Sequence, residues 1–180
     1  MNWMKKVAVA LVCLLPLGLQ AAKVDTLQVK SPSMNKSIEV VVVSPDVAAT
    51  KACPVIYLLH GYGGNARTWV GIKPDLSKIA DEKGIFFVCP DGKNTWYWDS
   101  PLNADVRYET FISDELVKYV DSHYKTVADR KGRAITGLSM GGHGAMWNGL
   151  RHSDVFSAAG STSGLSLIHI SEPTRRTPIS

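Results

Sequence analysis

The hydrophobic positions of the chain fall into short apolar runs separated by longer amphipathic segments. Apolar runs that predict β-strands cover residues 24–29, 37–43, 55–59, 85–89 and 134–136, with a last apolar piece at 155–160. Segments with apolar residues at helical spacing cover residues 73–83, 109–124 and 144–150. The runs at 55–59 and 85–89 are continuous, which is typical of strands buried on both faces. The pattern therefore predicts a single α/β domain with a mostly parallel sheet covered by helices on both faces.

The first 21 residues differ from the rest of the chain. Lys5 and Lys6 precede thirteen mostly apolar residues, 7–19, and small residues follow at Ala21 and Ala22. This order is typical of a secretory signal peptide, and we expect cleavage after Ala21. Because thirteen residues are too few to span a bilayer, the sequence predicts a periplasmic or secreted protein without stable membrane insertion.

The composition argues against a nucleic-acid-binding protein. The chain has 180 residues, of which 20 are Lys or Arg and 16 are Asp or Glu. Residues 1–21 and 165–180 hold four of the Lys and Arg residues and one of the acidic residues. Without them, 16 basic and 15 acidic residues remain. This near balance gives no electrostatic footprint for nucleic acid. The sequence also lacks HExxH and CxxC patterns, so we expect no metal site.

Two cysteines, Cys53 and Cys89, remain after the expected cleavage. In an exported protein such a pair could form a disulfide. Cys53, however, precedes the strand at 55–59, whereas Cys89 ends the strand at 85–89. If these strands are parallel neighbours, the two residues lie roughly 15–20 Å apart, and a disulfide needs Cα atoms within about 7 Å. We therefore expect two buried free thiols.

The motif Gly-Leu-Ser-Met-Gly-Gly at residues 137–142 lies between a predicted strand and a predicted helix. This is the nucleophile-elbow pattern, in which a sharp turn presents a serine at the top of a sheet. It predicts Ser139 as a nucleophile and the Met140 N–H as a donor to an oxyanion. Gly137 and Gly141 remove side chains that would collide with the strand or helix, and Gly142 is a further structural glycine of the motif. By chance alone such a pattern occurs in about one chain in twenty of this length, so a second motif is needed.

The second motif, His-Gly-Tyr-Gly-Gly at residues 60–64, follows the strand at 55–59. Ligands bind at the carboxyl ends of parallel strands, and a tetrahedral oxyanion needs two N–H donors. We therefore expect the second donor to be the Tyr62 N–H, although an ordinary strand-to-helix turn is the alternative. The loop glycines are Gly61, Gly63 and Gly64. We expect His60 to be structural, bonding nearby backbone, and His143 to follow the elbow helix rather than face the serine.

An aromatic stretch, Trp96, Tyr97 and Trp98, follows the strand at 85–89. Its place after the carboxyl end of a strand predicts a wall of the substrate pocket. The alternative is an aromatic cluster that caps the core. A short aromatic loop favours small or aromatic acyl groups over long chains.

Residues 54–164 resemble the putative esterase family of α/β-hydrolases, which includes S-formylglutathione hydrolases, tributyrin, feruloyl and acetyl-xylan esterases, and mycolyltransferases. The matching stretches are residues 57–64, 90–92 and 137–145. The resemblance implies an α/β-hydrolase fold and hydrolysis of short-chain or aromatic (feruloyl or acetyl) esters. It implies an acyl-enzyme on Ser139, backbone donors at Tyr62 and Met140, and no cofactor. The implied substrate is a small or polysaccharide-linked ester. The alternatives are an acyltransferase on the same fold and a non-catalytic carbohydrate-binding module.

The chain departs from the family pattern after the elbow. In the family the triad acid and histidine follow the serine, but here the only later acids are Asp154 and Glu172. The only histidines beyond the elbow helix are His152 and His169. Residues 165–180 resemble a translated sequencing adapter, so we expect a non-native tail there. We therefore expect residues 22–164 to be the N-terminal part of the catalytic domain, inactive because the triad acid and histidine are absent.

Overall fold

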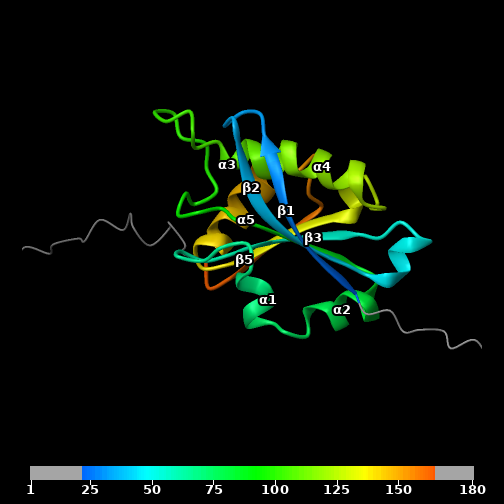
Figure 1. Cartoon of the computed structure of the whole chain (residues 1–180). Helices are drawn as coiled ribbons and strands as arrows, with labels where there is room; N and C mark the ends of the chain where they lie inside the picture. Colours follow the sequence, from blue (N-terminus) through cyan, green and yellow to red (C-terminus); the bar gives the residue numbers. More distant parts are fainter. Residues whose placement is uncertain (1–21, 165–180) are drawn as a thin grey trace, which may run out of the picture.

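The computed structural model of the chain describes residues 22–164, which form one six-stranded sheet with helices on both faces (Figure 1). The strands are β1 (Lys23–Ser31), β2 (Lys36–Ser44), β3 (Val55–Leu59), β4 (Phe86–Pro90), β5 (Arg133–Leu138) and β6 (Ala158–Thr162). The helical segments are η1 (Asp46–Ala49), α1 (Thr68–Ile72), α2 (Leu76–Lys83), α3 (Tyr108–Thr110), the π-helical turn η2 (Phe111–Glu115), α4 (Leu116–His123), η3 (Arg130–Gly132) and α5 (Met140–Arg151).

The sheet has the strand order β1-β2-β4-β3-β5-β6. The hairpin β1–β2 and the pair β2–β4 are antiparallel, whereas β4–β3, β3–β5 and β5–β6 are parallel. The prediction of a mostly parallel sheet is therefore confirmed. The parallel strands β3, β4 and β5 place the loops that follow them at one edge of the sheet, which is where the sequence predicts the site.

The central strands are buried on both faces, as their continuous apolar runs predict. Along β4, Phe86 and Val88 pack into one core cluster, while Phe87 and Cys89 pack into a second cluster on the opposite face. The first cluster is covered by α3–α4 and α5, and the second by α1 and α2 (Figure 1). Alternate side chains of one strand thus serve two layers of helices.

The structure differs from the prediction in the bounds of several elements and in one additional helix. The helix predicted from residue 73 begins at Leu76, because Pro74 lies in the preceding loop, and it ends as predicted at Gly84, whose φ is 63°. The short helix α1 was not predicted. The last apolar piece forms a strand only from Ala158, since Phe156 instead turns into the core and contacts the ring of Tyr57 at 5.7 Å.

Cys53 and Cys89 are both buried and free, so the prediction of two unpaired thiols is confirmed. Among residues 22–164, no helix is long and apolar enough to cross a membrane. The expected signal peptide and the expected non-native tail lie outside the described residues.

Candidate active site

Ser139 occupies a strained turn between β5 and α5. Its backbone has φ 54° and ψ −116°, a region that side-chain-bearing residues rarely adopt. The turn is held on both sides, because the Ser139 N–H donates to the Thr162 carbonyl at 2.9 Å and the Ser139 carbonyl accepts from the His143 N–H at 3.0 Å. This is the geometry of a nucleophile elbow, which presents a serine hydroxyl at the carboxyl end of a strand.

The glycines around Ser139 allow backbone segments to touch. A Cβ on Gly137 would lie 2.3 Å from the Gly141 backbone, and a Cβ on Gly141 would lie 2.2 Å from the Leu59 carbonyl oxygen. A Cβ on Gly142 would meet the Ser161 hydroxyl at 2.5 Å. The end of β3 and the start of α5 therefore approach closely only because no side chain separates them.

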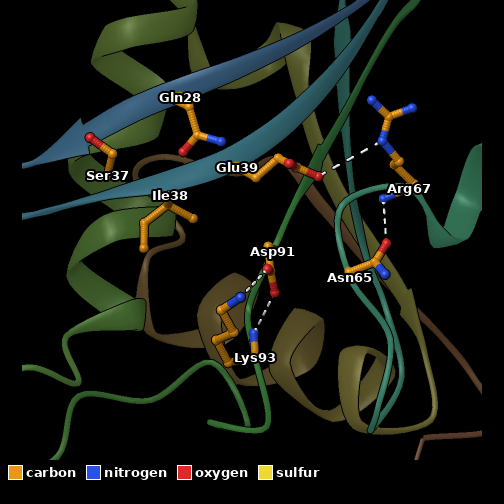
Figure 2. Close-up of a pocket in the computed structure, with 8 residues that line it drawn as sticks. All are labelled: Gln28, Ser37, Ile38, Glu39, Asn65, Arg67, Asp91 and Lys93. Atoms are coloured by element: carbon orange, nitrogen blue, oxygen red, sulfur yellow. Dashed lines mark hydrogen bonds and ion pairs between the residues drawn. The ribbon is translucent and has the colours of Figure 1, made fainter.

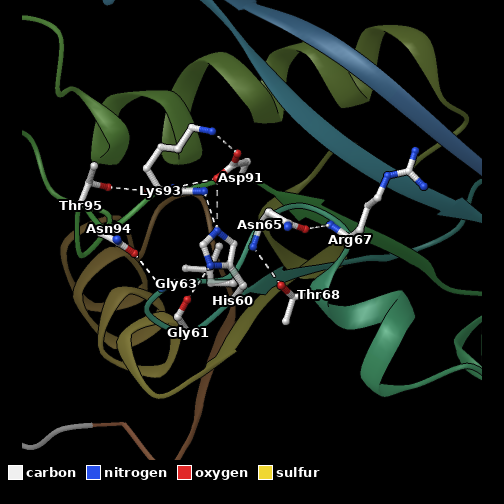
Figure 3. A network of polar contacts seen from close by, with 12 residues as sticks. His60, Gly61, Gly63, Asn65, Arg67, Thr68, Asp91, Lys93, Asn94 and Thr95 are labelled. Carbon is white, nitrogen blue, oxygen red and sulfur yellow. Dashed lines mark hydrogen bonds and ion pairs between the residues drawn. The ribbon is translucent and has the colours of Figure 1, made fainter.

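The glycine-rich loop after β3 lies directly against the elbow. A Cβ on Gly61 would be 3.5 Å from Ser139 Cβ, so the loop backbone borders the predicted nucleophile. The Gly63 N–H donates to Asn94 Oδ1 at 2.7 Å, which ties the loop to the segment after β4 (Figure 3). Neither the Tyr62 N–H nor the Met140 N–H donates a hydrogen bond to any residue within 22–164. Both predicted oxyanion donors are thus without a hydrogen-bond partner in the described part of the chain.

His60 is buried and uses both ring nitrogens on the backbone, as the sequence predicts for a structural histidine. Its Nδ1 lies 2.7 Å from the Gly61 carbonyl oxygen, which can only accept, so Nδ1 carries the proton. Nε2 is then the acceptor for the Gly92 N–H at 2.9 Å. Two hydrogen bonds therefore fix the orientation of the ring (Figure 3).

Asp91 lies beside His60 but is engaged by a lysine. Its carboxylate accepts from the Lys93 N–H at 2.9 Å and from Lys93 Nζ at 2.6 Å. Burial alone would raise the pKa of Asp91, but His60, whose Nε2 lies 3.5 Å from Asp91 Oδ1, and the bonds and charge of Lys93 outweigh it and hold the pKa well below its usual range. Asp91 therefore remains a carboxylate that orders the loop after β4.

The aromatic stretch after β4 is divided between core and surface. Tyr97 is fully buried, so the expectation that its side chain lines the pocket is wrong for this residue. Trp98 is 38% exposed and its Nε1 donates to His143 Nε2 at 3.2 Å, while the Trp96 ring contacts the His143 ring at 5.5 Å. His143 is thus held in an aromatic cluster and follows its helix, as expected. Trp96 and Trp98 remain candidates for the pocket wall.

The far end of α5 is fixed by a buried carboxylate that the sequence did not single out. Glu109 accepts hydrogen bonds from Trp147 Nε1 at 2.7 Å, Arg151 Nε at 2.7 Å and His152 Nε2 at 2.9 Å. Burial would raise the pKa of Glu109, but these donors lower it below its ordinary value. A periodic pattern reveals a helix but not its polar partners, so only the fold could reveal this cluster.

No histidine side chain in the described part of the chain forms a hydrogen bond with Ser139. His60 and His152 are engaged as described above, His143 bonds Trp98, and His123 bonds the Tyr119 carbonyl at 2.8 Å. The Ser139 hydroxyl forms no hydrogen bond with another residue of 22–164. Asp154, the one downstream acid in this range, is exposed just beyond α5.

A polar cavity of about 290 Å³ lies at the same edge of the sheet, beside β1 and β2 (Figure 2). Its walls are Gln28, Ser37, Ile38, Glu39, Asn65, Arg67, Asp91 and Lys93. Its charges are paired, with Lys93 Nζ 2.6 Å from Asp91 and Arg67 Nε 4.0 Å from Glu39. It therefore offers both donors and acceptors with little net charge. Within residues 22–164, no group of three or more His, Cys, Asp or Glu side chains could hold a metal ion.

Comparison with known proteins gives a consistent group of relatives. The sequence profile of a family described as putative esterase matches residues 31–173, which extends beyond the described part of the chain. An esterase of Mycobacterium tuberculosis is 31% identical over 144 residues, which cover 76% of this chain and 31% of that protein. A diacylglycerol acyltransferase/mycolyltransferase of Mycobacterium leprae is 33% identical over 156 residues, covering 79% of this chain and 44% of that protein.

A solved ferulic acid esterase is similar in both sequence and structure. It is 32% identical, has a TM-score of 0.66, and is matched over 77% of this chain and 61% of its own. This chain thus spans less than two thirds of the length of each of these three relatives.

Proposed function

Because the chain belongs to the putative esterase family of α/β-hydrolases, we propose that it is part of a secreted serine carboxylesterase. The observation that carries the proposal is the strained Ser139 at the start of α5, next to the glycine-rich loop, with the N–H groups of Tyr62 and Met140 unpaired within residues 22–164. In the proposed reaction Ser139 Oγ attacks the ester carbonyl carbon and the alcohol leaves. The N–H groups of Tyr62 and Met140 stabilise the oxyanion, and water then hydrolyses the acyl-enzyme.

The activation of Ser139 requires groups that residues 22–164 do not supply. A serine hydroxyl attacks only when a histidine, oriented by an acid, takes its proton. The four histidines in this range are all bonded elsewhere. We therefore propose that the triad acid and histidine lie outside residues 22–164, which by themselves would not turn over esters. Secretion rests on the signal-peptide pattern at residues 1–21.

The proposed substrates are short-chain or aromatic esters, such as acetyl or feruloyl esters. Trp96 and Trp98 supply aromatic surface close to α5, where a planar acyl group could stack. The polar cavity lined by Asn65 and Arg67 suits a hydroxylated alcohol, such as a sugar of a polysaccharide-linked ester. The similar ferulic acid esterase supports the aromatic acyl group.

An acyltransferase on the same scaffold is the second candidate, and the similar mycolyltransferase favours it. The two functions share the acyl-enzyme and differ in the acceptor, which is water in one and a sugar hydroxyl in the other. Product analysis with an excess of free sugar separates them, because a transferase forms a new sugar ester whereas an esterase forms free acid.

The test of the proposed function is Ser139→Ala in a full-length version of the protein. Loss of the hydroxyl removes the group that forms the acyl-enzyme, so ester turnover should fall by orders of magnitude. Ser153→Ala is the matched control, since Ser153 lies exposed in the turn after α5, and it should retain full activity. If a fluorophosphonate probe labels Ser139→Ala as completely as the parent, Ser139 is not the nucleophile.

A further inference from the structure

Tyr97 connects three segments of the candidate site from a fully buried position. Its hydroxyl donates to the His60 carbonyl oxygen at 3.1 Å. Its ring fills space that two glycines leave open, because a Cβ on Gly92 would lie 2.1 Å from the ring and a Cβ on Gly144 would lie 2.5 Å from it. Its carbonyl accepts from Asn148 Nδ2 at 3.2 Å. Tyr97 thus joins the glycine-rich loop at residues 60–64, here called the oxyanion loop, to the loop after β4 and to the elbow helix α5.

The backbone around Tyr97 is strained. Trp96 and Tyr97 have φ values of 57° and 60°, so two consecutive residues with bulky side chains adopt the left-handed conformation. Such a conformation costs free energy and persists only where the surroundings enforce it. The chain therefore bears a cost to place the Tyr97 side chain beneath the oxyanion loop, which a simple core aromatic would not require.

The direction of the predicted donor at Tyr62 depends on His60. The Gly61 carbonyl and the Tyr62 N–H belong to one planar trans peptide, so they point in opposite directions. The Gly61 carbonyl accepts from His60 Nδ1 at 2.7 Å and from the Gly64 N–H at 3.0 Å. These bonds hold the carbonyl towards the His60 ring, and the Tyr62 N–H consequently points away from it.

His60 is in turn held by Tyr97 and Gly92. The Gly92 N–H fixes the ring by donating to Nε2 at 2.9 Å, and the Tyr97 hydroxyl fixes the carbonyl of the same residue. The two rings also meet edge to face, with centroids 5.8 Å apart. Both the backbone and the side chain of His60 are therefore braced from the segment after β4.

We propose that Tyr97 is a positioning residue for the oxyanion hole: through His60 it sets the direction of the Tyr62 N–H. This inference rests on the proposed esterase or acyltransferase chemistry and assigns to Tyr97 no contact with substrate. Burial raises the pKa of Tyr97 well above its ordinary value, so its hydroxyl stays protonated and remains a donor across the working range of pH.

The first test compares Tyr97→Phe with Tyr57→Phe in the active, full-length enzyme. Phe keeps the ring that packs against Gly92 and Gly144 but removes the donor to His60. A misdirected oxyanion donor stabilises the transition state less but changes the binding of the substrate little. We therefore expect kcat to fall about tenfold with little change in KM. Tyr57 has a buried hydroxyl without a partner in the described structure. Its replacement should leave kcat unchanged.

Rates are normalised to active sites counted by complete fluorophosphonate labelling, so unfolded protein does not affect them. An unchanged kcat in Tyr97→Phe, or an equal loss in Tyr57→Phe, would overturn the proposal. Labelling of Ser139→Ala tests the proposed function separately. Its loss supports Ser139 as the nucleophile, and its retention would overturn the proposed function whatever the Tyr97 variants show.

A second pair of variants tests the step through His60. Asn places its amide N–H near the position of Nδ1 and can still donate to the Gly61 carbonyl, whereas Gln reaches towards the position of Nε2 and Gly92. His60→Asn should therefore keep a higher kcat than His60→Gln, by about tenfold if the Gly61 bond aims the donor. A purely structural histidine would give equal losses, and either equality or the reverse order would contradict the proposal.

Discussion

The Gly141→Ala substitution tests the close contact between α5 and the end of β3. An added Cβ would lie 2.2 Å from the Leu59 carbonyl oxygen and 2.6 Å from the His60 carbonyl oxygen. Both neighbours are backbone atoms, so no side chain can rotate away. To reach an ordinary contact distance, α5 and β3 must separate by about 1 Å. This movement displaces Ser139 relative to the loop that carries the Tyr62 N–H.

Two opposing effects set the size of the loss in stability. Overpacking costs about 1–3 kcal/mol, and a clash with backbone belongs at the upper end of that range. Ala is favoured over Gly in a helix by about 1 kcal/mol, which offsets part of the cost. We expect the free energy of unfolding to fall by about 2 kcal/mol. Because a displacement of about 1 Å can cost a hundredfold in rate, kcat should fall by about that factor.

Gly71→Ala in α1 is the matched control, because a Cβ there meets nothing within 4 Å. It should leave kcat unchanged and leave stability equal or slightly higher. Urea unfolding followed by tryptophan fluorescence measures the stability, and initial rates on p-nitrophenyl butyrate measure kcat. If Gly141→Ala is as stable and as active as Gly71→Ala, the steric argument for the glycines of the elbow is wrong.

Three further predictions concern the same molecule. Glu109→Gln should lower the free energy of unfolding by about 1–3 kcal/mol near pH 7. Folding lowers the pKa of Glu109, so the stability that its carboxylate contributes is lost at low pH. The difference in free energy of unfolding between variant and parent should therefore fade as the pH falls below the ordinary pKa of 4.5. Arg67→Ala should raise KM for a feruloylated oligosaccharide but not for methyl ferulate. An equal effect on both would show that the polar cavity does not bind the sugar part of the substrate. Initial rates on p-nitrophenyl acetate or methyl ferulate should far exceed those on a palmitate ester, and a preference for long chains would exclude the small pocket.

The sequence predicted the elements whose signal is local. The continuous runs at 55–59 and 85–89 indicated doubly buried strands, and Gly84 marked the end of α2. It could not predict α1, which has only five residues and no capping signal. The elbow and the loop at 60–64 were visible because their chemistry requires glycines at fixed spacing.

Tyr97 shows where such reasoning stops. A tyrosine between two tryptophans after a strand has the composition of a pocket wall. Its burial depends on Gly144 and Asn148, which come from a helix far along the chain and only meet it in the fold. The partners of Glu109 were hidden for the same reason. Local patterns thus located the predicted nucleophile and donors, whereas the residues that brace them could be recognised only from tertiary contacts.

The two buried thiols have a consequence for the secretion proposed above. A secreted chain is synthesised in a reducing compartment and, once across the membrane, meets oxidants that pair exposed cysteines. Cys53 precedes β3 and Cys89 lies near the end of the neighbouring parallel strand β4, both shielded from solvent. The folded state of residues 22–164 therefore contains no disulfide to form or to isomerise. Under the secretion proposed above, folding must bury both sulfurs before an oxidase reaches them.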